Sequence, residues 1–414
     1  MVKNRHLYLL LGLLVFMLLA AACSSKQPPK EPDSAKSADT AAIEDTSPIV
    51  IGYIAALSGP ASELGIGGRM AVELAVEQVN AAGGINGHPI ELIVRDDQYN
   101  PTTAVNLTNE MINKHGVQAI IGPTGSSIVQ AVLPVTKSAG VPHFINLAQN
   151  NEFTEPAIPN AFRFAMPNWV QTKAVADFVN SRFNKVGIIT DTSAYGTPGG
   201  EEVMAHLKKS GQDDKVVGWE KYNPKDLDMT PQLLRLKNAG AQVLVLWGLG
   251  NDAATIKKNM KDMGYDIPVI GANALVMKNY RDLAGELVKG TYTTYNKAFL
   301  VELTPEAEAY ANAWRSKYPD DEVYWGTKEE PGYYLTSTVQ TYDAANVLFA
   351  ALRNAKSFEH ADIIDALNNI SSFKGVNGTY EFSADDHEAL GPEDNIFVEI
   401  LPDNVAAVDL EQIK

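Results

Sequence analysis

Short apolar runs alternate with amphipathic stretches along most of the chain from Pro48 onward. Six apolar runs are expected to form strands, and they cover residues 49–54, 90–94, 117–121, 142–145, 186–189 and 243–246. The first run and the last two are apolar at nearly every position, which is typical of strands that a parallel sheet buries on both faces. Between the strands, apolar residues recur at helical spacing, as in the stripe of Ala71, Leu74, Ala75 and Val79. The alternation predicts an α/β fold whose parallel sheets are covered by helices.

Several helix ends carry the residues that favour them. Thr230 and Thr304 each precede a proline, which places an N-cap residue before proline at the first helical position. Gly83 and Gly240 are expected to end two helices. The strand–helix rhythm resumes after residue 180, so we expect two similar lobes, each a doubly wound parallel sheet.

The first residues predict the compartment. Lys3 and Arg5 precede an apolar run at residues 7–19, and three alanines follow it. This order is that of a secretory signal, here residues 1–22, and the run of about 13 residues is shorter than the ~20 that a membrane-spanning helix needs. A signal anchor that stays in place is the alternative.

The only cysteine, Cys23, follows these alanines directly. The segment from Leu19 to Cys23 resembles a bacterial lipoprotein box, which implies that the Cys23 thiol is the lipid attachment site; an unpaired thiol is the alternative. Residues 24–47 are rich in Ser, Lys, Pro, Ala, Asp and Thr and have almost no large apolar side chain, so residues 23–47 are expected to be a lipidated, flexible tether.

Length and charge narrow the class of protein. About 365 residues remain after the tether, which is too many for one core and suits two domains. Two of the 34 basic residues lie in the signal, so 32 remain against 50 acidic residues, a net charge of −18. Such an acidic surface disfavours nucleic acid and anionic lipid headgroups. We therefore expect no nucleic-acid partner.

Candidate binding segments follow the strands, because ligands of open parallel sheets bind beyond the carboxyl ends of the strands. Five such segments are rich in Gly, hydroxyl, amide and aromatic residues: 122–127, 146–150, 190–196, 247–250 and 271–273. In the first of them, Ser126 and Ser127 precede a helix, and hydroxyls with free N–H groups at a helix start form an anion-binding corner. An ordinary N-cap at these serines, and ordinary turns elsewhere, are the alternative interpretations.

Enzymatic signatures do not stand out. The glycines at 65–68 lack the spacing of a dinucleotide fingerprint, and neither a phosphate-binding loop nor a nucleophile elbow occurs. The histidines have no metal-ligand spacing, and His143 is interpreted as a hydrogen-bonded structural residue. Asp96 and Asp97 are interpreted as a cap at a strand end rather than an acid–base pair. We expect no catalytic residue, no metal and no cofactor.

Several segments resemble branched-chain amino acid (leucine/isoleucine/valine) binding proteins. They are residues 51–60, 71–75, 80–87, 95–97, 121–127, 194–196 and 342–344, of which Asn-Ala-Ala-Gly-Gly-Ile-Asn-Gly at 80–87 is the most specific. The resemblance implies a type I periplasmic binding protein fold that serves an ABC transporter, with three crossings of the chain between lobes near Pro167, Tyr295 and Gly375. The implied lobes are residues 48–167 with 295–375, and residues 168–294 with 376–414.

The resemblance also implies roles for single residues. Ser126 matches the serine that holds a ligand carboxylate, Tyr195 matches a cleft tyrosine of the second lobe, and Leu147 and Gln149 fall on a small residue and a threonine of the family. Asn273 stands where leucine-type binders place an acid for the ligand ammonium. The candidate ligand-binding residues are Ser126, Ser127, Leu147, Ala148, Gln149, Tyr195, Trp247 and Asn273. In addition, Leu64 replaces a tyrosine that often flanks the pocket.

Together these features predict an extracytoplasmic solute-binding lipoprotein, periplasmic or at the cell surface, that delivers a small polar ligand to ABC permease subunits. The ligand is expected to have a carboxylate or another acceptor-rich head. Because Asp191 or Asp252 can supply a substitute charge, an amino acid stays open as the ligand. A sensing receptor of the same fold and a secreted enzyme are the rival functions, and nothing in the sequence demands more than a monomer.

Overall fold

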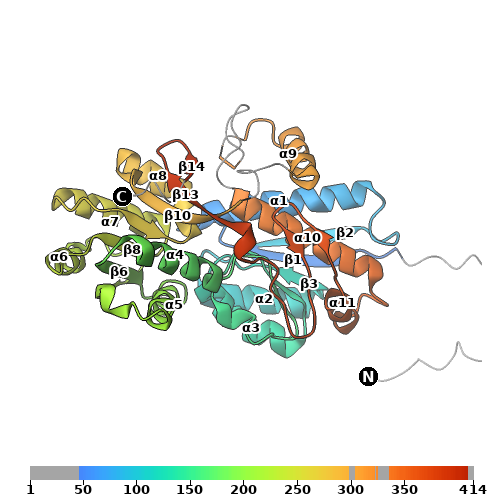
Figure 1. Cartoon of the computed structure of the whole chain (residues 1–414). Coiled ribbons are helices and arrows are strands. Elements are labelled where there is room, and N and C mark those ends of the chain that lie inside the picture. Colours follow the sequence, from blue (N-terminus) through green and yellow to red (C-terminus); the bar gives the residue numbers. More distant parts are fainter. Residues whose placement is uncertain (1–45, 298–303, 322, 325–334, 409–414) are drawn as a thin grey trace, which may run out of the picture. The chain divides into compact units, whose positions relative to one another are not determined.

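The computed structural model describes residues 46–297, 304–321, 323–324 and 335–408, without the side chains of Leu335 and Thr336. The predicted signal peptide, Cys23 and all but the last two residues of the predicted tether lie outside the described residues. Residues from Asp45 onward form one compact unit. Within its described part, the strands assemble into two large sheets and one small one (Figure 1).

The first sheet is parallel throughout and has the strand order β2-β1-β3-β4-β5. Its strands are β1 (Ile49–Ala55), β2 (Ile90–Asp96), β3 (Ala119–Ile121), β4 (His143–Ile145) and β5 (Ala161–Arg163). Every residue of β1 except Val50 is buried, because helices cover both faces of the sheet. This burial explains why the sequence of β1 is apolar rather than alternating.

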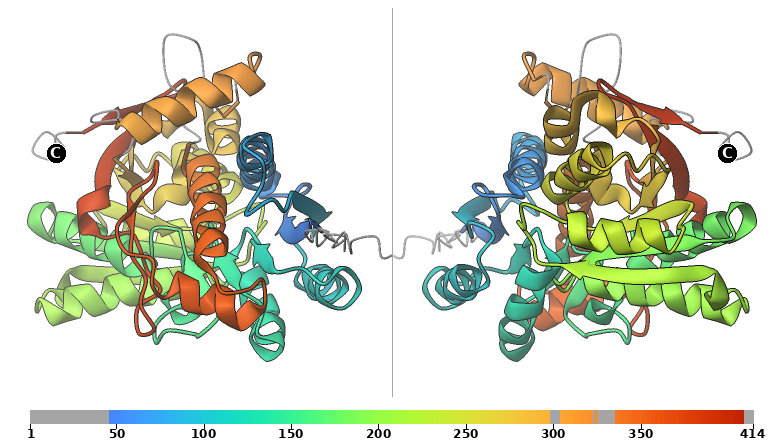
Figure 2. Two further views of the ribbon diagram at one scale, coloured as in Figure 1. Left: turned by 90° about the vertical axis from the view of Figure 1, so that its right-hand side faces the viewer. Right: turned by 90° about the vertical axis from the view of Figure 1, so that its left-hand side faces the viewer.

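Two groups of helices cover the first sheet. One face packs against α1 (Ser62–Ala81), α10 (Leu335–Asn354) and α11 (His360–Leu367), and α1 and α10 lie side by side (Figure 2). The other face packs against α2 (Pro101–His115) and α3 (Ser126–Ala139). The predicted first lobe thus has the helix–sheet–helix layering expected from the sequence.

The second sheet has the strand order β14-β13-β10-β9-β8-β6-β7. Its strands are β6 (Val186–Asp191), β7 (Val216–Tyr222), β8 (Val243–Trp247), β9 (Val269–Gly271), β10 (Thr291–Asn296), β13 (Asn395–Ile400) and β14 (Val405–Ala407). The strands from β6 to β10 are parallel, whereas β13 and β14 pair antiparallel at one edge. The expectation of a wholly parallel sheet is wrong here, because four residues join β13 to β14 and so short a connection permits only antiparallel pairing.

Helices also cover both faces of the second sheet. They are α4 (Asn168–Arg182) and α5 (Gly196–Lys209) on one face, and α6 (Thr230–Asn238), α7 (Gly250–Asp262) and α8 (Lys278–Ala284) on the other. The remaining elements are α9 (Pro305–Lys317), the small sheet of β11 (Phe373–Lys374) and β12 (Thr379–Tyr380), and the 3-10 turns η1 (Asn151–Phe153), η2 (Asp213–Lys215), η3 (Asn273–Val276), η4 (Gly285–Val288) and η5 (Pro392–Asp394). None of the helices in the described part of the chain has the length and apolar character that crossing a membrane requires.

The two predicted threonine caps have different outcomes. Thr304 precedes α9, and its side chain accepts a hydrogen bond from the Ala307 N–H at 3.1 Å, which confirms it as an N-cap. Thr230 is instead the first residue of α6, and its own N–H donates to Asp228 Oδ1 at 2.8 Å. The predicted start of α6 is therefore wrong by one residue.

The glycines of α1 let the helix lie directly on β1. A Cβ on Gly65 would come within 2.0 Å of the Ala56 carbonyl oxygen, and one on Gly68 within 2.3 Å of the Tyr53 hydroxyl. That hydroxyl donates to the Gly65 carbonyl at 2.8 Å. The Gly65–Gly68 run thus serves close packing, in agreement with its lack of a dinucleotide fingerprint.

The chain passes between the two large sheets after β5, after β10 and before β13. Pro167 directly precedes α4, and Tyr295 lies near the end of β10. We propose that the first two crossings lie at these passages. After Gly375 the chain still packs on the first lobe, because β12 pairs with β11 and the Phe382 ring contacts Phe162 at 5.3 Å between centroids. We propose that the third crossing lies at residues 391–394, just before β13.

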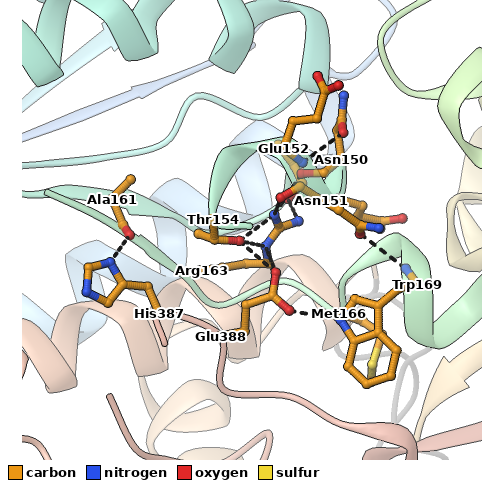
Figure 3. A network of polar contacts seen from close by, with 12 residues as sticks. Asn150, Asn151, Glu152, Thr154, Ala161, Arg163, Met166, Trp169, His387 and Glu388 are labelled. Atoms are coloured by element: carbon orange, nitrogen blue, oxygen red, sulfur yellow. Dashed lines mark hydrogen bonds and ion pairs between the residues drawn. The ribbon is translucent and has the colours of Figure 1, made fainter. Parts of the chain in front are cut away.

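A buried ion pair joins two of these passages. Arg163 at the end of β5 is fully buried, and its Nε lies 3.2 Å from Oε1 of Glu388 (Figure 3). Thr154 donates to the same Oε1 at 2.7 Å, and the Trp169 indole N–H of α4 donates to Oε2 at 2.9 Å. The Arg163 Nη2 also donates to the Asn150 carbonyl at 2.7 Å. This network ties the segment before β13 to β5 and to the start of α4.

Candidate ligand-binding site

A cavity lies where loops after the strands of the first and the second sheet meet. The centre of a water molecule can occupy about 60 Å³ of it, within about 580 Å³ of space not filled by atoms that includes open solvent. Its lining is Ala61, Leu64, Tyr99, Thr124, Gly125, Ser126, Leu147, Ala148, Gln149, Tyr195, Leu249, Asn273, Ala274, Val276 and Gln340. The structure therefore brings together six of the eight candidate ligand-binding residues, which come from the loops after β3, β4, β6 and β9.

Ser126 is the first residue of α3 and is almost completely buried at the cavity wall. Gly125 occupies the N-cap position, and neither it nor Ser126 caps the helix with a side chain. Instead, Ser126 Oγ accepts a hydrogen bond from the Gln149 N–H at 3.4 Å, which leaves the hydroxyl proton to be donated elsewhere. The interpretation of Ser126 as an ordinary N-cap is wrong.

Ser127 and Trp247 do not line the cavity. Ser127 Oγ accepts from the Ala194 N–H at 3.3 Å, so it joins the start of α3 to the loop after β6. Trp247 is the last residue of β8, fully buried in the core of the second lobe. Its indole packs on Gly199 of α5, where a Cβ would come within 2.3 Å of the ring.

Three side-chain amides form a hydrogen-bonded network beside the cavity. Gln149 Nε2 donates to Asn273 Oδ1 at 2.6 Å, and this bond joins the two lobes. Gln171 of α4 donates from Nε2 to Gln149 Oε1 at 2.9 Å. Gln171 Oε1 in turn accepts from the Asn273 N–H at 3.1 Å and from the Thr294 hydroxyl at 2.9 Å. All four residues are buried, so these bonds are shielded from water.

The lining residues carry no charged side chain, and the nearest carboxyls lie behind the wall. Burial, and after it the charges of Asp191, Asp97 and Asp252, raise the pKa of the lining Tyr99. Burial also raises the pKa of Asp97 and of Asp252 to about 6. Asp191 Oδ1 accepts from the backbone N–H of Ser193, and Asp252 Oδ1 accepts from the Lys225 N–H. Neither of the two predicted substitute acids forms part of the cavity lining.

The sequence did not point to Gln171, Tyr99 or Gln340. Gln171 and Gln340 lie inside helices, where a glutamine is usually on the surface, yet both are buried. Tyr99 follows Gln98 in a tight turn in which both residues have left-handed backbone angles (φ 57° and 55°). Three polar residues at the start of α4 are completely buried: Asn168, Gln171 and Thr172. This grouping is the one pattern that marks the helix as part of the site.

Within the described part of the chain, His143 and Asp96 make structural contacts. Among the residues that the structure describes, no group of three or more His, Cys, Asp or Glu side chains is arranged to hold a metal ion. His143 is buried, its Nε2–H donates to the Gly122 carbonyl at 2.6 Å, and burial lowers its pKa to about 4. Asp96 accepts from the Leu57 N–H at 2.9 Å and from the Ser58 hydroxyl at 2.8 Å. Both residues have the structural roles expected from the sequence.

Comparison with known proteins agrees with this geometry. The family model described as periplasmic binding protein matches residues 48–398. A curated relative, Leu/Ile/Val-binding protein homolog 3 of Brucella melitensis, is 27% identical over 338 residues, which cover 81% of this chain and 87% of the relative. Homolog 7 of Brucella abortus is 28% identical over 337 residues, covering 78% and 81%.

Solved structures share the fold over most of the chain. A type 1 periplasmic binding protein from Bordetella pertussis superposes with a TM-score of 0.83 at 34% identity, covering 87% of this chain and 99% of that one. The branched-chain amino acid transporter substrate-binding protein LivJ of Streptococcus pneumoniae, solved in complex with isoleucine, has a TM-score of 0.76 at 25% identity and covers 87% and 99%. The predicted type I fold, with its two doubly wound lobes, is confirmed apart from the antiparallel edge of the second sheet.

Proposed function

This chain belongs to the periplasmic binding protein family, and from that premise we propose that it captures a small ligand between its lobes and delivers it to an ABC importer. It is a solute-binding protein of the branched-chain amino acid type, a family without enzymatic activity. The observation that carries the proposal is the cavity lined by loops from both sheets, because a ligand held there contacts both lobes at once.

The lining suggests a ligand with an apolar tail and an acceptor-rich head. Leu64, Leu147, Leu249 and Val276 supply apolar surface for the tail. The hydroxyl proton of Ser126 and the amide N–H groups of the network are donors for the head. An ammonium group would find no carboxylate among the lining residues, and a buried unpaired ammonium is costly. We infer a carboxylate or amide head without a free α-amino group.

Binding is proposed to close the two lobes on the ligand. Direct bonds already join them: Gln149 to Asn273, and Asn150 Nδ2 to the Ala194 carbonyl at 3.2 Å. The Glu63 carboxylate of α1 accepts from the Lys278 N–H at 2.8 Å and from the Asn279 N–H at 3.2 Å, at the start of α8. Such contacts form only when the lobes meet, so a ligand that bridges them favours the closed form over the open one.

A head-group series tests the proposal. The purified protein is titrated with leucine, 4-methylpentanoate, 4-methylpentanamide and 3-methylbutylamine, and with 3-phenylpropanoate and 2-phenylethylamine as aromatic counterparts. A ligand at 100 times its dissociation constant adds about 2.7 kcal/mol of stability, which thermal unfolding detects. We expect the carboxylates or the amide to stabilise the protein most. Stabilisation by leucine alone would overturn the head-group assignment and leave the binding function in place.

Ser126 gives the sharpest single test of the cavity. Ser126→Ala should weaken binding of the preferred ligand by about 1–3 kcal/mol, because its hydroxyl is proposed to donate to a charged head. Ser181→Ala is the matched control, since the Ser181 hydroxyl bonds only to the Phe178 carbonyl of its own helix. Equal affinities of both variants, measured calorimetrically, would remove Ser126 from the site.

The membrane anchor and the importer are proposed on the sequence alone. Cys23 and the importer contact lie outside what the described residues reveal, so each needs its own experiment. Cys23→Ala should release the protein from the membrane fraction of the native cell. Deletion of the permease genes of the proposed importer should abolish uptake of the ligand; intact uptake would instead favour the sensing receptor.

A further inference from the structure

Gln171 occupies a special place beside the cavity. It is the fourth residue of α4, at the end of the first turn, and is completely buried. It does not line the cavity, yet it bonds to Gln149 of one lobe and to Asn273 of the other. Any preference of Gln171 for one orientation is therefore transmitted to two residues that line the cavity.

Two backbone groups fix the orientation of the Gln171 amide. The Met166 carbonyl lies 3.0 Å from Nε2 and can only accept, whereas the Asn273 N–H lies 3.1 Å from Oε1 and can only donate. The Thr294 hydroxyl adds a second donor to Oε1 at 2.9 Å. A flipped Gln171 would place N–H against N–H and oxygen against oxygen, so one orientation satisfies the backbone and the other does not.

This orientation dictates the next two amides in turn. Because Gln171 Nε2 donates, the Gln149 atom that faces it must be Oε1, and Gln149 Nε2 then points toward Asn273. Asn273 must meet that N–H with Oδ1, which turns Nδ2 away from the network. No described residue bonds to Asn273 Nδ2, and the second N–H of Gln149 Nε2 has no partner among them either. Both amides therefore have donors left over.

We propose that Gln171 is a positioning residue that makes this side of the cavity a hydrogen-bond donor surface and thereby selects ligands with an acceptor head against ligands with an ammonium head. The inference rests on the proposed function, since it assigns the selectivity of that same cavity. It adds that the selectivity is set by a residue that touches no ligand. Met166, which fixes the orientation of the Gln171 amide, lies in the passage between β5 and α4, and Gln171 lies at the start of α4.

The polarity is tested with two substitutions of Gln171. Gln171→Met keeps a side chain of similar size and removes every hydrogen bond of the Gln171 amide. The amides of Gln149 and Asn273 can then rotate and present either oxygen or nitrogen to the cavity. Gln171→Glu offers Gln149 an acceptor, which turns Gln149 Nε2 toward it and Asn273 Oδ1 toward the cavity. The readout is the ratio of the dissociation constants for 4-methylpentanoate and 3-methylbutylamine, a pair that differs in its head.

We expect the preference for the carboxylate to fall at least tenfold in Gln171→Met and further in Gln171→Glu. A merely structural role would weaken both probes by one common factor and leave the ratio unchanged, which would overturn the proposal. A wild-type preference for the amine would overturn it too. Gln242→Met is the matched control, because Gln242 bonds to two backbone N–H groups (Asn184 and Lys185) away from the cavity; it should leave the ratio as it is.

A ligand-free measurement separates this inference from the proposed function. If neither probe binds the wild-type protein, the proposed ligand class fails, and selective ¹⁵N-glutamine labelling then decides the polarity. Both Nε2 protons of Gln171 should be protected from solvent exchange, because each is donated to a buried acceptor. Rapid exchange of both protons would overturn the inference.

Discussion

The amide network beside the cavity and the ion-pair network of Arg163 lie next to one another but are built from different chemistry. The first consists of neutral amides, Gln149, Gln171 and Asn273, whose donors and acceptors depend on how each amide is turned. The second places a buried guanidinium against the Glu388 carboxylate and holds both with Thr154 and Trp169 (Figure 3). One faces the ligand cavity, and the other faces the passages between the sheets.

The two networks differ in charge, and each kind of network suits a different role in the protein. Burial of an ion pair costs a large desolvation free energy, and loss of one partner strongly destabilises the folded protein. A buried ion pair therefore suits a junction between the lobes whose geometry is fixed. Neutral amides cost less to bury and can present either polarity, so they suit a surface that reads the head group of a ligand. Four predictions separate these roles.

The largest effect is expected at the ion pair. Arg163→Met leaves the partly buried Glu388 carboxylate without its cation and empties a fully buried polar position, so it should lower the free energy of unfolding by about 3 kcal/mol. Urea unfolding measures this loss. Arg235→Met is the control, because the pair of Arg235 with Glu220 is exposed on the arginine side and should cost no more than about 1 kcal/mol. Similar losses in both variants would show that the Arg163 network does not hold the joint.

The next effect is expected in ligand affinity rather than stability. Asn273→Asp replaces the free Nδ2 donor by an oxygen, so binding of a carboxylate ligand should weaken by about 1–3 kcal/mol while ligands with an amine gain relative to it. Isothermal titration calorimetry on both head groups measures the change. Asn113→Asp on the exposed side of α2 is the control. If the carboxylate and amine ligands kept the same order of affinity, the amide network would not determine which head group is bound.

A pH effect is expected at Glu202 of α5, which accepts hydrogen bonds from Asn151 and Thr172 at the edge of the ion-pair network. Burial raises the pKa of Glu202 to about 7 from an ordinary value of 4.5. Between these values the unfolded chain binds fewer protons than the folded one, so the free energy of unfolding falls as the pH rises from 4.5 to 7. Because Glu202 is partly exposed, we expect about 1–2 kcal/mol.

Glu202→Gln should remove this share of the pH dependence. Other buried acids, such as Asp343 with a pKa of about 7, add slopes of the same sign, so the difference between variant and wild type is the quantity to compare. Denaturant titrations at pH 5, 6, 7 and 8 provide it. Parallel stability curves for the two proteins would assign the slope to the other acids.

The smallest effect is expected at Thr294. Thr294→Val removes one of the two donors to Gln171 Oε1 and should cost about 0.5–1.5 kcal/mol of stability together with a small loss of head-group selectivity. Thr291→Val is the control in the same strand, because the Thr291 hydroxyl bonds to Tyr280 at 2.7 Å and is remote from the amides. The control should lose stability without any change of selectivity. A selectivity change in both variants would point to the strand β10 rather than to Gln171.

The parts of the fold that the sequence predicted are those set by local pattern. Apolar runs predicted β1, β6 and β8 because strands buried on both faces leave a continuous signature. The rule that ligands meet strand ends predicted the loops around the cavity. Trp247 was predicted to bind the ligand but does not line the cavity, because β8 runs one residue further than its apolar run and the tryptophan packs on Gly199 as a strand residue.

Other features depend on partners that are distant in the sequence. Ser126 and Ser127 are adjacent on a helix, so they point in directions about 100° apart and only one of them faces the cavity. The orientation of the Gln171 amide depends on its hydrogen bonds with Met166, Asn273 and Gln149. The residues next to Gln171 in the sequence do not predict these contacts. The resemblance implied a third passage near Gly375, but the small sheet of β11 and β12 keeps the chain on the first lobe there.

The close packing of α1 on β1 has a consequence for attempts to retarget this protein to other ligands. Leu64 precedes Gly65, which packs so closely on Ala56 that an added Cβ would come within 2.0 Å of the Ala56 carbonyl oxygen. A larger residue at Leu64 therefore has to fit by its rotamer alone, whereas Leu249 and Val276 belong to a loop and a 3-10 turn of the second sheet. A library aimed at a new ligand tail is best randomised at Leu249 and Val276, with Leu64 varied only toward smaller side chains.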